Sequence, residues 1–254
     1  MARASESQCT LSESEEWDLR VDLAAAFRWA ERFNWHESVA NHFSASLSAN
    51  GRRFLLNPKW KHFSTISASD LVVVDLDDPD SASNTELVDP SALTIHGSVH
   101  SALPNAKVLL HCHPDYATAL STLKDPSFRP IDQNTCRFYN RMAIDLSFGG
   151  FGDDQEEGAR LARAMGNHST MMMGNHGVAV TAETVAHAFE QLYYLERASK
   201  TLMVAYASGQ PLNELSPDVA EKTAQSWDNY RGISDAHFTH LKSQLDNEDP
   251  SYRH

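Results

Sequence analysis

Two short stretches of the chain carry histidines whose spacing suits metal binding. Residues 107–116 read KVLLHCHPDY, so His111 and His113 end an apolar run with one residue between them. Side chains two residues apart in a β-strand lie on the same face, where two imidazoles can occupy adjacent positions around a metal ion. Two hydrogen-bonded surface histidines at a strand end would show the same spacing. The motif alone leaves both interpretations open.

A third histidine strengthens the metal interpretation. His176 lies in GNHG, whose glycines leave little side chain nearby and permit a backbone that projects the imidazole into a cleft. His176 could also be an ordinary turn residue, but with His111 and His113 it would complete a three-histidine site that leaves coordination positions open. We predict one divalent metal ion per subunit at these three residues. Zinc is expected first, with manganese and iron as alternatives.

The elements that must position these histidines follow from hydrophobic periodicity. Helices are predicted over 18–33, 91–103, 116–123, 153–167 and 182–207, and strands over 71–74, 107–113 and two segments of 170–180. Residues 42–58 are expected to form a hairpin that turns at Asn50 and Gly51. The segment QNTCRFYNRM has no clear periodicity. Alternating strands and helices predict an α/β fold with helices packed on a central sheet.

The composition limits the possible partners. The 254 residues are 41% hydrophobic and 22% charged, a mixture typical of soluble globular proteins. The net charge of −13 and the absence of basic clusters argue against nucleic acid or an anionic membrane as partner. No apolar run approaches the ~20 residues of a membrane span, and the N-terminus lacks a signal-peptide pattern. Three scattered cysteines suit a reducing compartment, so we expect a cytoplasmic protein.

Several ordered blocks resemble the class II aldolase/adducin superfamily. HCHPDYATALS lies 63 residues before the histidine of MMMGNHGVAV, as in the superfamily's metal motif. LLNPKWKHFSTISASDLVVVD and TIHGSVHSALPNAKVLLHCH resemble the segments that lead into that motif. The resemblance covers about residues 17–210.

The resemblance implies a fold and an assembly. We expect a three-layer α/β/α sandwich with a central, largely antiparallel sheet. Residues 1–15 are expected to be a flexible, Ser- and Glu-rich tail, and residues 16–254 a single domain with a C-terminal helical extension. Relatives are commonly homotetramers with sites at subunit interfaces, so a homotetramer that binds a small-molecule substrate is expected.

The chain departs from the sugar-phosphate aldolases of this superfamily. Their catalytic glutamate, four residues before His96, is replaced by Ala92, as in adducin-type members. His42 replaces the asparagine of one phosphate-binding segment and Trp60 replaces the glycine of another. A tryptophan would obstruct the close backbone approach that a phosphate needs. We therefore place the chain in the adducin-like branch and expect a substrate without phosphate.

Other residues are then candidates for catalysis and binding. Glu37, His96 and Tyr139 are the expected catalytic residues; their alternatives are a structural hydrogen bond for Glu37, an orienting role for His96 and packing for Tyr139. The expected substrate-binding residues are His42, Lys59, Trp60, Ser91 and Arg137. Plain surface charge is the alternative for Lys59 and Arg137. His100 is expected to be a solvated helix residue.

The residues and the resemblance together predict a metal-dependent carbon–carbon lyase. The metal would stabilise the enolate formed by retro-aldol cleavage or decarboxylation of a small hydroxy-keto, 2-oxo or aromatic carboxylic acid. One alternative is a non-catalytic adducin-like interaction protein, against which the retained histidines weigh. The other is an Fe(II)-dependent oxygenase on the same fold.

Overall fold

The strands of the protein form one mixed sheet. The structure is a computed structural model that describes residues 11–150, 154–230 and 232–254. In this part of the chain seven strands lie in the order β3-β2-β1-β4-β7-β6-β5. They are β1 (His42–Ser46), β2 (Arg53–Leu56), β3 (Val72–Asp75), β4 (Val108–Cys112), β5 (Ala143–Asp145), β6 (Thr170–Met173) and β7 (Gly177–Ala182). Only the β5–β6 pair is parallel, so the expected, largely antiparallel sheet is confirmed.

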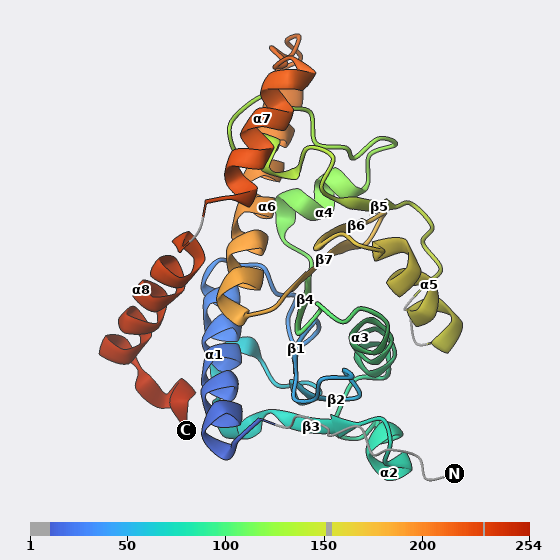
Figure 1. Ribbon diagram of the computed structural model, residues 1–254, viewed down its shortest axis with the longest axis vertical. Coiled ribbons are helices and arrows are strands. Elements are labelled where there is room, and N and C mark those ends of the chain that lie inside the picture. The colour runs from blue at the N-terminus through green and yellow to red at the C-terminus, as the bar shows by residue number, and fades with distance from the viewer. Residues whose placement is uncertain (1–10, 151–153, 231) are drawn as a thin grey trace, which may run out of the picture.

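Helices cover both faces of this sheet. Their bounds are α1 (Glu13–Arg32), α2 (Pro79–Ala82), α3 (Pro90–Ala102), α4 (Asp115–Ser121), α5 (Gln155–Met165), α6 (Val185–Ala207), α7 (Pro217–Asp228) and α8 (Ile233–Glu248). Single 3-10 turns are η1 (Phe63–Thr65), η2 (Ala68–Asp70), η3 (Thr135–Phe138) and η4 (Pro250–Arg253). Figure 1 shows α3 and α5 on one side of the sheet and α1 and α6 on the other. The three-layer α/β/α prediction is therefore confirmed.

The alternation of side chains along β1 and β4 separates core from site. Phe43 of β1 points toward α1, where its ring stacks on Phe27 at 4.8 Å between centroids. Leu110 of β4 belongs to the same cluster. Because alternate residues face opposite sides of a sheet, His42 and His111 lie on the face covered by α3, and β1 and β4 pair them directly. The strand pattern thus brings polar side chains together in one place beneath α3.

The first helix begins earlier than the sequence indicated. Ser12 and Glu15 form a reciprocal capping box, and α1 starts at Glu13 inside the stretch expected to be a tail. The expectation for residues 1–15 is therefore wrong for residues 12–15, and residues 1–10 lie outside the described part. The segment QNTCRFYNRM contains the 3-10 turn η3.

The C-terminal helices pack back onto the domain. Phe238, Leu241 and Leu245 of α8 and the fully buried Tyr252 belong to the same hydrophobic cluster as α1 and α6. The indole Nε1 of Trp29 donates a hydrogen bond to the carbonyl oxygen of Leu241 at 2.9 Å. None of the helices described is long and apolar enough to cross a bilayer.

Candidate metal centre

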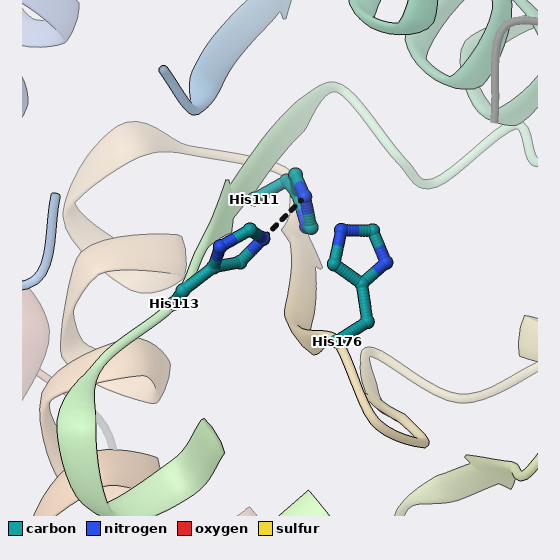
Figure 2. A group of neighbouring side chains, drawn as sticks. All are labelled: His111, His113 and His176. Atoms are coloured by element: carbon teal, nitrogen blue, oxygen red, sulfur yellow. Dashed lines mark hydrogen bonds between the residues drawn. The ribbon is translucent and has the colours of Figure 1, made fainter. Parts of the chain in front are cut away.

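Three histidines from two neighbouring strand ends converge on one space. His111 is the fourth residue of β4, His113 follows the strand, and His176 lies in the turn between β6 and β7. One ring nitrogen from each lies within 4.8 Å of the other two. Figure 2 shows the three rings facing one another, with His111 on β4, His113 just after it and His176 on the adjacent turn. The structure therefore brings together the three residues that the sequence singled out.

The outer hydrogen bonds of two of these rings fix which nitrogen faces inward. His111 Nδ1 donates to the carbonyl oxygen of Val178 at 2.9 Å, and His113 Nδ1 donates to Glu37 Oε2 at 2.7 Å. Both Nε2 atoms are then free to coordinate a metal, and they lie 3.3 Å apart. A tetrahedral zinc ion about 2.0–2.1 Å from each nitrogen would hold them about 3.3 Å apart. The separation of these donors fits a zinc-sized ion.

Burial keeps these rings in the form that binds metal. Burial is the main cause that holds the pKa of His111 well below its ordinary value, and the nearby His176 lowers it further. Burial and the neighbouring His113 lower the pKa of His176 to about 4. Because a neutral imidazole is the ligand form, both rings are ready to coordinate at neutral pH.

The turn that carries His176 depends on close packing. The left-handed backbone conformation in this turn belongs to Asn175, with φ of 55°, rather than to either glycine. Gly177 is needed for a different reason: a Cβ atom there would lie 2.4 Å from His113 Cδ2 and 2.7 Å from the Cys112 carbonyl oxygen. Its missing side chain allows the turn to approach β4, and this approach joins His176 to the other two histidines.

The three histidines line one cavity of about 560 Å³. Its walls come from the segment after α1, the start of β1, the segment after β2, the start of α3 and the turns after β5 and β6. They include Glu37, Asn41, His42, Asn57, Lys59, Trp60, Asp89, Ser91, Ala92, Ile95, Phe148 and Asn175 beside the three histidines. A space of this size accommodates a small organic ligand.

Four of the predicted substrate-binding residues lie on these walls. The Lys59 amine donates to the Thr85 carbonyl oxygen at 3.2 Å and lies 4.7 Å from the centre of the Trp60 ring. Trp60 is 73% exposed and has the positive φ of 62°, a left-handed backbone conformation that favours glycine. His42 and Ser91 complete the four, with Ser91 Oγ 3.4 Å from His42 Nε2.

Glu37 also lines the cavity, but its hydrogen bond differs from the expected role. Its carboxylate accepts the hydrogen of His113 Nδ1, an arrangement that orients a metal-binding imidazole and raises its basicity. The alternative of a structural hydrogen bond therefore describes this contact better than a role as acid or base.

Two expectations on α3 need correction. His96 is fully buried beneath His42 and does not line the cavity, so its side chain does not reach a ligand there. Its orienting alternative fits, because its Nε2 lies 2.9 Å from His42 Nδ1. His100 is 2% exposed rather than solvated, since its ring bonds to Ser44 and to the Ala106 carbonyl oxygen.

Arg137 and Tyr139 lie elsewhere in this chain. The Arg137 guanidinium stacks between the rings of Tyr194 and Trp227, at 4.5 and 5.0 Å from their centroids. It lines a separate cavity with Asp228, because η3 packs on α7. Tyr139 follows η3 and does not line the metal cavity. The expectation that both act in this cavity is not met within one protomer.

Asp89 and Phe148 also line the cavity, although the sequence did not indicate them. Asp89 caps α3 by accepting from Ser91 N at 2.9 Å, and the Asp-Pro pair at positions 89 and 90 could have indicated this. Phe148 reaches the cavity from the segment after β5, with its ring 5.9 Å from that of His176. No periodicity in the sequence marks that position.

Comparisons with known proteins define the family. The profile of the Class II Aldolase and Adducin N-terminal domain matches residues 21–203. A Caulobacter vibrioides protein named only for its membership of aldolase class 2 is 31% identical, over 81% of this chain and 79% of its own. Decarboxylase NovR of Streptomyces niveus is 27% identical, over 86% and 83% of the two chains.

A solved structure agrees with these matches. An aldolase II superfamily protein from Pseudomonas syringae has a TM-score of 0.85 and 30% identity, with 96% of this chain and 98% of that one covered. The chain belongs to the class II aldolase and adducin family, and it has a cluster of three histidines that can hold a metal ion.

Proposed function

We propose that this protein is a divalent-metal-dependent lyase that breaks a carbon–carbon bond in a small, non-phosphorylated hydroxy-keto, 2-oxo or aromatic carboxylic acid. The observation that carries the proposal is the three-histidine cluster at the wall of a cavity of about 560 Å³. An interaction surface alone has no need of metal-binding groups that open into a cavity. The similarity to a protein named as a decarboxylase supports the same reaction class.

The residues of the chain divide the work of such a reaction. His111, His113 and His176 would hold the ion, zinc first and manganese or iron as alternatives. When bound, the ion would supply Lewis-acid stabilisation of the enolate left after the bond breaks. The Val178 carbonyl and the Glu37 carboxylate accept from the Nδ1 atoms of His111 and His113 and so fix the orientation of these two rings. Ile95 and Phe148 give the wall an apolar part, which limits water around the substrate.

The charge of the cavity supports a substrate without phosphate. Among the described lining residues, the acidic ones are Glu37 and Asp89 and the basic one is Lys59. The Lys59 amine already bonds to the Thr85 carbonyl. Two carboxylates would repel a phosphate dianion, and only one amine, already hydrogen-bonded, would attract it. A carboxylic acid bound through the metal needs no further cationic groups.

Metal analysis of the purified protein tests the first half of the proposal. We expect stoichiometric divalent metal in the wild type and none in the His111→Ala/His113→Ala double variant. His240→Ala, which changes an exposed histidine of α8, is the matched control and should keep its metal. Full metal occupancy in the double variant would overturn the assignment of the site.

Turnover assays test the second half. The metal-loaded protein should release carbon dioxide or a smaller carbonyl compound from 2-oxo or aromatic hydroxy acids at the same rate with and without oxygen. Turnover that requires oxygen would favour an Fe(II)-dependent oxygenase. Absence of turnover with a panel of such acids, together with tight binding to a protein partner, would favour an adducin-like interaction protein.

A further inference from the structure

A hydrogen-bonded chain runs from the cavity wall into the protein beneath α3. His42 Nδ1 lies 2.9 Å from His96 Nε2, and His96 Nδ1 bonds to Ser44 Oγ. Ser44 Oγ lies 2.6 Å from His100 Nε2, and His100 Nδ1 lies 2.6 Å from the Ala106 carbonyl oxygen. All four side chains are buried, with His42 the most exposed at 7%. Water therefore does not compete for these bonds.

The Ala106 carbonyl fixes the direction of every bond because it can only accept. His100 Nδ1 must carry the hydrogen, so Nε2 of the neutral ring accepts the single hydrogen of Ser44. Ser44 Oγ must then accept from His96 Nδ1, which leaves His96 Nε2 as an acceptor. His42 Nδ1 donates to that atom, and His42 Nε2 carries no hydrogen.

Burial keeps the two inner rings neutral, as this reasoning requires. It lowers the pKa of His100 to about 4 and holds the pKa of His96 well below its ordinary value. Each of these two rings thus carries one hydrogen at neutral pH. A second hydrogen on His96 or His100 would leave a donor facing a donor inside the buried chain.

The free lone pair of His42 lies at the cavity. Ser91 Oγ is 3.4 Å from His42 Nε2, but Ser91 donates its only hydrogen to Asp89 Oδ1 at 2.6 Å. The side chain of Ala92, in the position of the missing glutamate, offers no polar atom on the same wall. This part of the wall therefore presents acceptors, namely His42 Nε2 and the Asp89 carboxylate.

We propose that His42 Nε2 is a fixed hydrogen-bond acceptor for a hydroxyl group of the substrate, and that His96, Ser44 and His100 are positioning residues that hold it in this tautomer. The inference rests on the proposed function, because it assumes that the acid binds in this cavity. It narrows the substrate to hydroxylated acids whose hydroxyl points toward β1 and whose carboxylate points away. A carboxylate on this side would meet a lone pair and a second carboxylate.

A pair of ligands that differ by one hydroxyl tests the acceptor. Calorimetry with the zinc-loaded full chain should show that 3-hydroxypyruvate binds about 5-fold more tightly than pyruvate, the effect of one net hydrogen bond. In His42→Phe the two affinities should become equal. Equal affinities in the wild type, or an unchanged ratio in His42→Phe, would overturn the proposal.

Variants of Ser44 test the buried chain. Ser44→Ala removes the acceptor of His96 Nδ1, which frees His96 to donate from Nε2 and lets the hydrogen of His42 move to its own Nε2. The nitrogen spectra of the histidine-labelled Ser44→Ala variant should therefore lose the pattern of hydrogen on His42 Nδ1 alone, whereas Ser44→Thr keeps the hydroxyl and should retain it. A purely structural role for Ser44 would lower the unfolding temperature without changing the tautomer of His42, and that result would contradict the positioning role.

The tautomer can also be read in the wild type without any variant. Long-range proton–nitrogen correlation spectra of histidine-labelled protein distinguish a ring nitrogen that carries hydrogen from one that does not. His42 should show a hydrogen on Nδ1 and none on Nε2; the reverse pattern would refute the inference. Since neither measurement needs turnover, an inactive protein with the expected tautomer and affinity ratio would overturn the proposed lyase and leave the acceptor intact.

Discussion

Removal of the charge on Glu37 should lower the affinity of the site for metal. The Glu37→Gln variant keeps an oxygen that can accept from His113 Nδ1, but it loses the carboxylate that makes the ring a better ligand. Loss of such an outer carboxylate typically costs about 10–100-fold in metal affinity. The side chain of Glu37 is 58% exposed, so water screens its charge and the lower end of the range applies. We expect a loss of about 10-fold, and a larger loss in Glu37→Ala.

Competition between the protein and a chelator of known affinity measures this effect. Glu86→Gln, which changes an exposed glutamate outside the cavity lining, is the matched control and should leave the affinity unchanged. If metal affinity stays at the wild-type level in Glu37→Gln while turnover disappears, Glu37 acts on the substrate as an acid or base. That result would refute the orienting role argued from its contact with His113.

Three further predictions concern stability and the shape of the site. Because burial lowers the pKa of His100 to about 4, the unfolded chain binds a proton that the folded one does not between pH 4 and about 6.5. The free energy of unfolding should therefore fall by up to about 3 kcal/mol for this residue as pH falls through that range. Urea unfolding at several pH values should show a shallower pH dependence of stability in His100→Asn than in the wild type. An equal pH dependence in the two proteins would contradict this. Gly177→Ala should displace His113 and reduce metal content, while Gly97→Ala, which meets only the Leu76 side chain at 3.3 Å, should retain it; normal metal content in Gly177→Ala would show that the turn has room. Trp60→Gly should leave the unfolding temperature unchanged or raise it, because the residue has φ of 62° and is 73% exposed, and a marked decrease would mean that the indole stabilises the fold.

The periodic elements were predictable because their signals are local. The strand that ends in His111 and the helix that carries His96 are found where the sequence indicated them, since apolar spacing and an X-Pro boundary define both. The start of α1 was missed because serine and glutamate suggested a solvated tail, although Ser12 and Glu15 form a capping box.

The metal cluster was visible in the sequence and the buried chain behind it was not. His111 and His113 are two residues apart, so strand geometry alone puts them on one side. His42 and Ser44 show the same spacing, and His96 and His100 lie one helical turn apart. Only the pairing of β1 with β4 and the position of α3 over both strands bring the two pairs together.

The C-terminal helices lie outside the region matched by the family profile but pack on the domain. The family profile ends at residue 203, before α7 and α8, yet Tyr252 is fully buried and Trp29 of α1 bonds to α8. A chain cut at the end of the profile would expose the apolar side of α1 to water, at a cost of about 25 cal/mol for each Å² uncovered. The region that the family profile matches is thus smaller than the packed unit of this chain, and proteolysis in the segment between α7 and α8 should loosen α1 before it reaches the sheet.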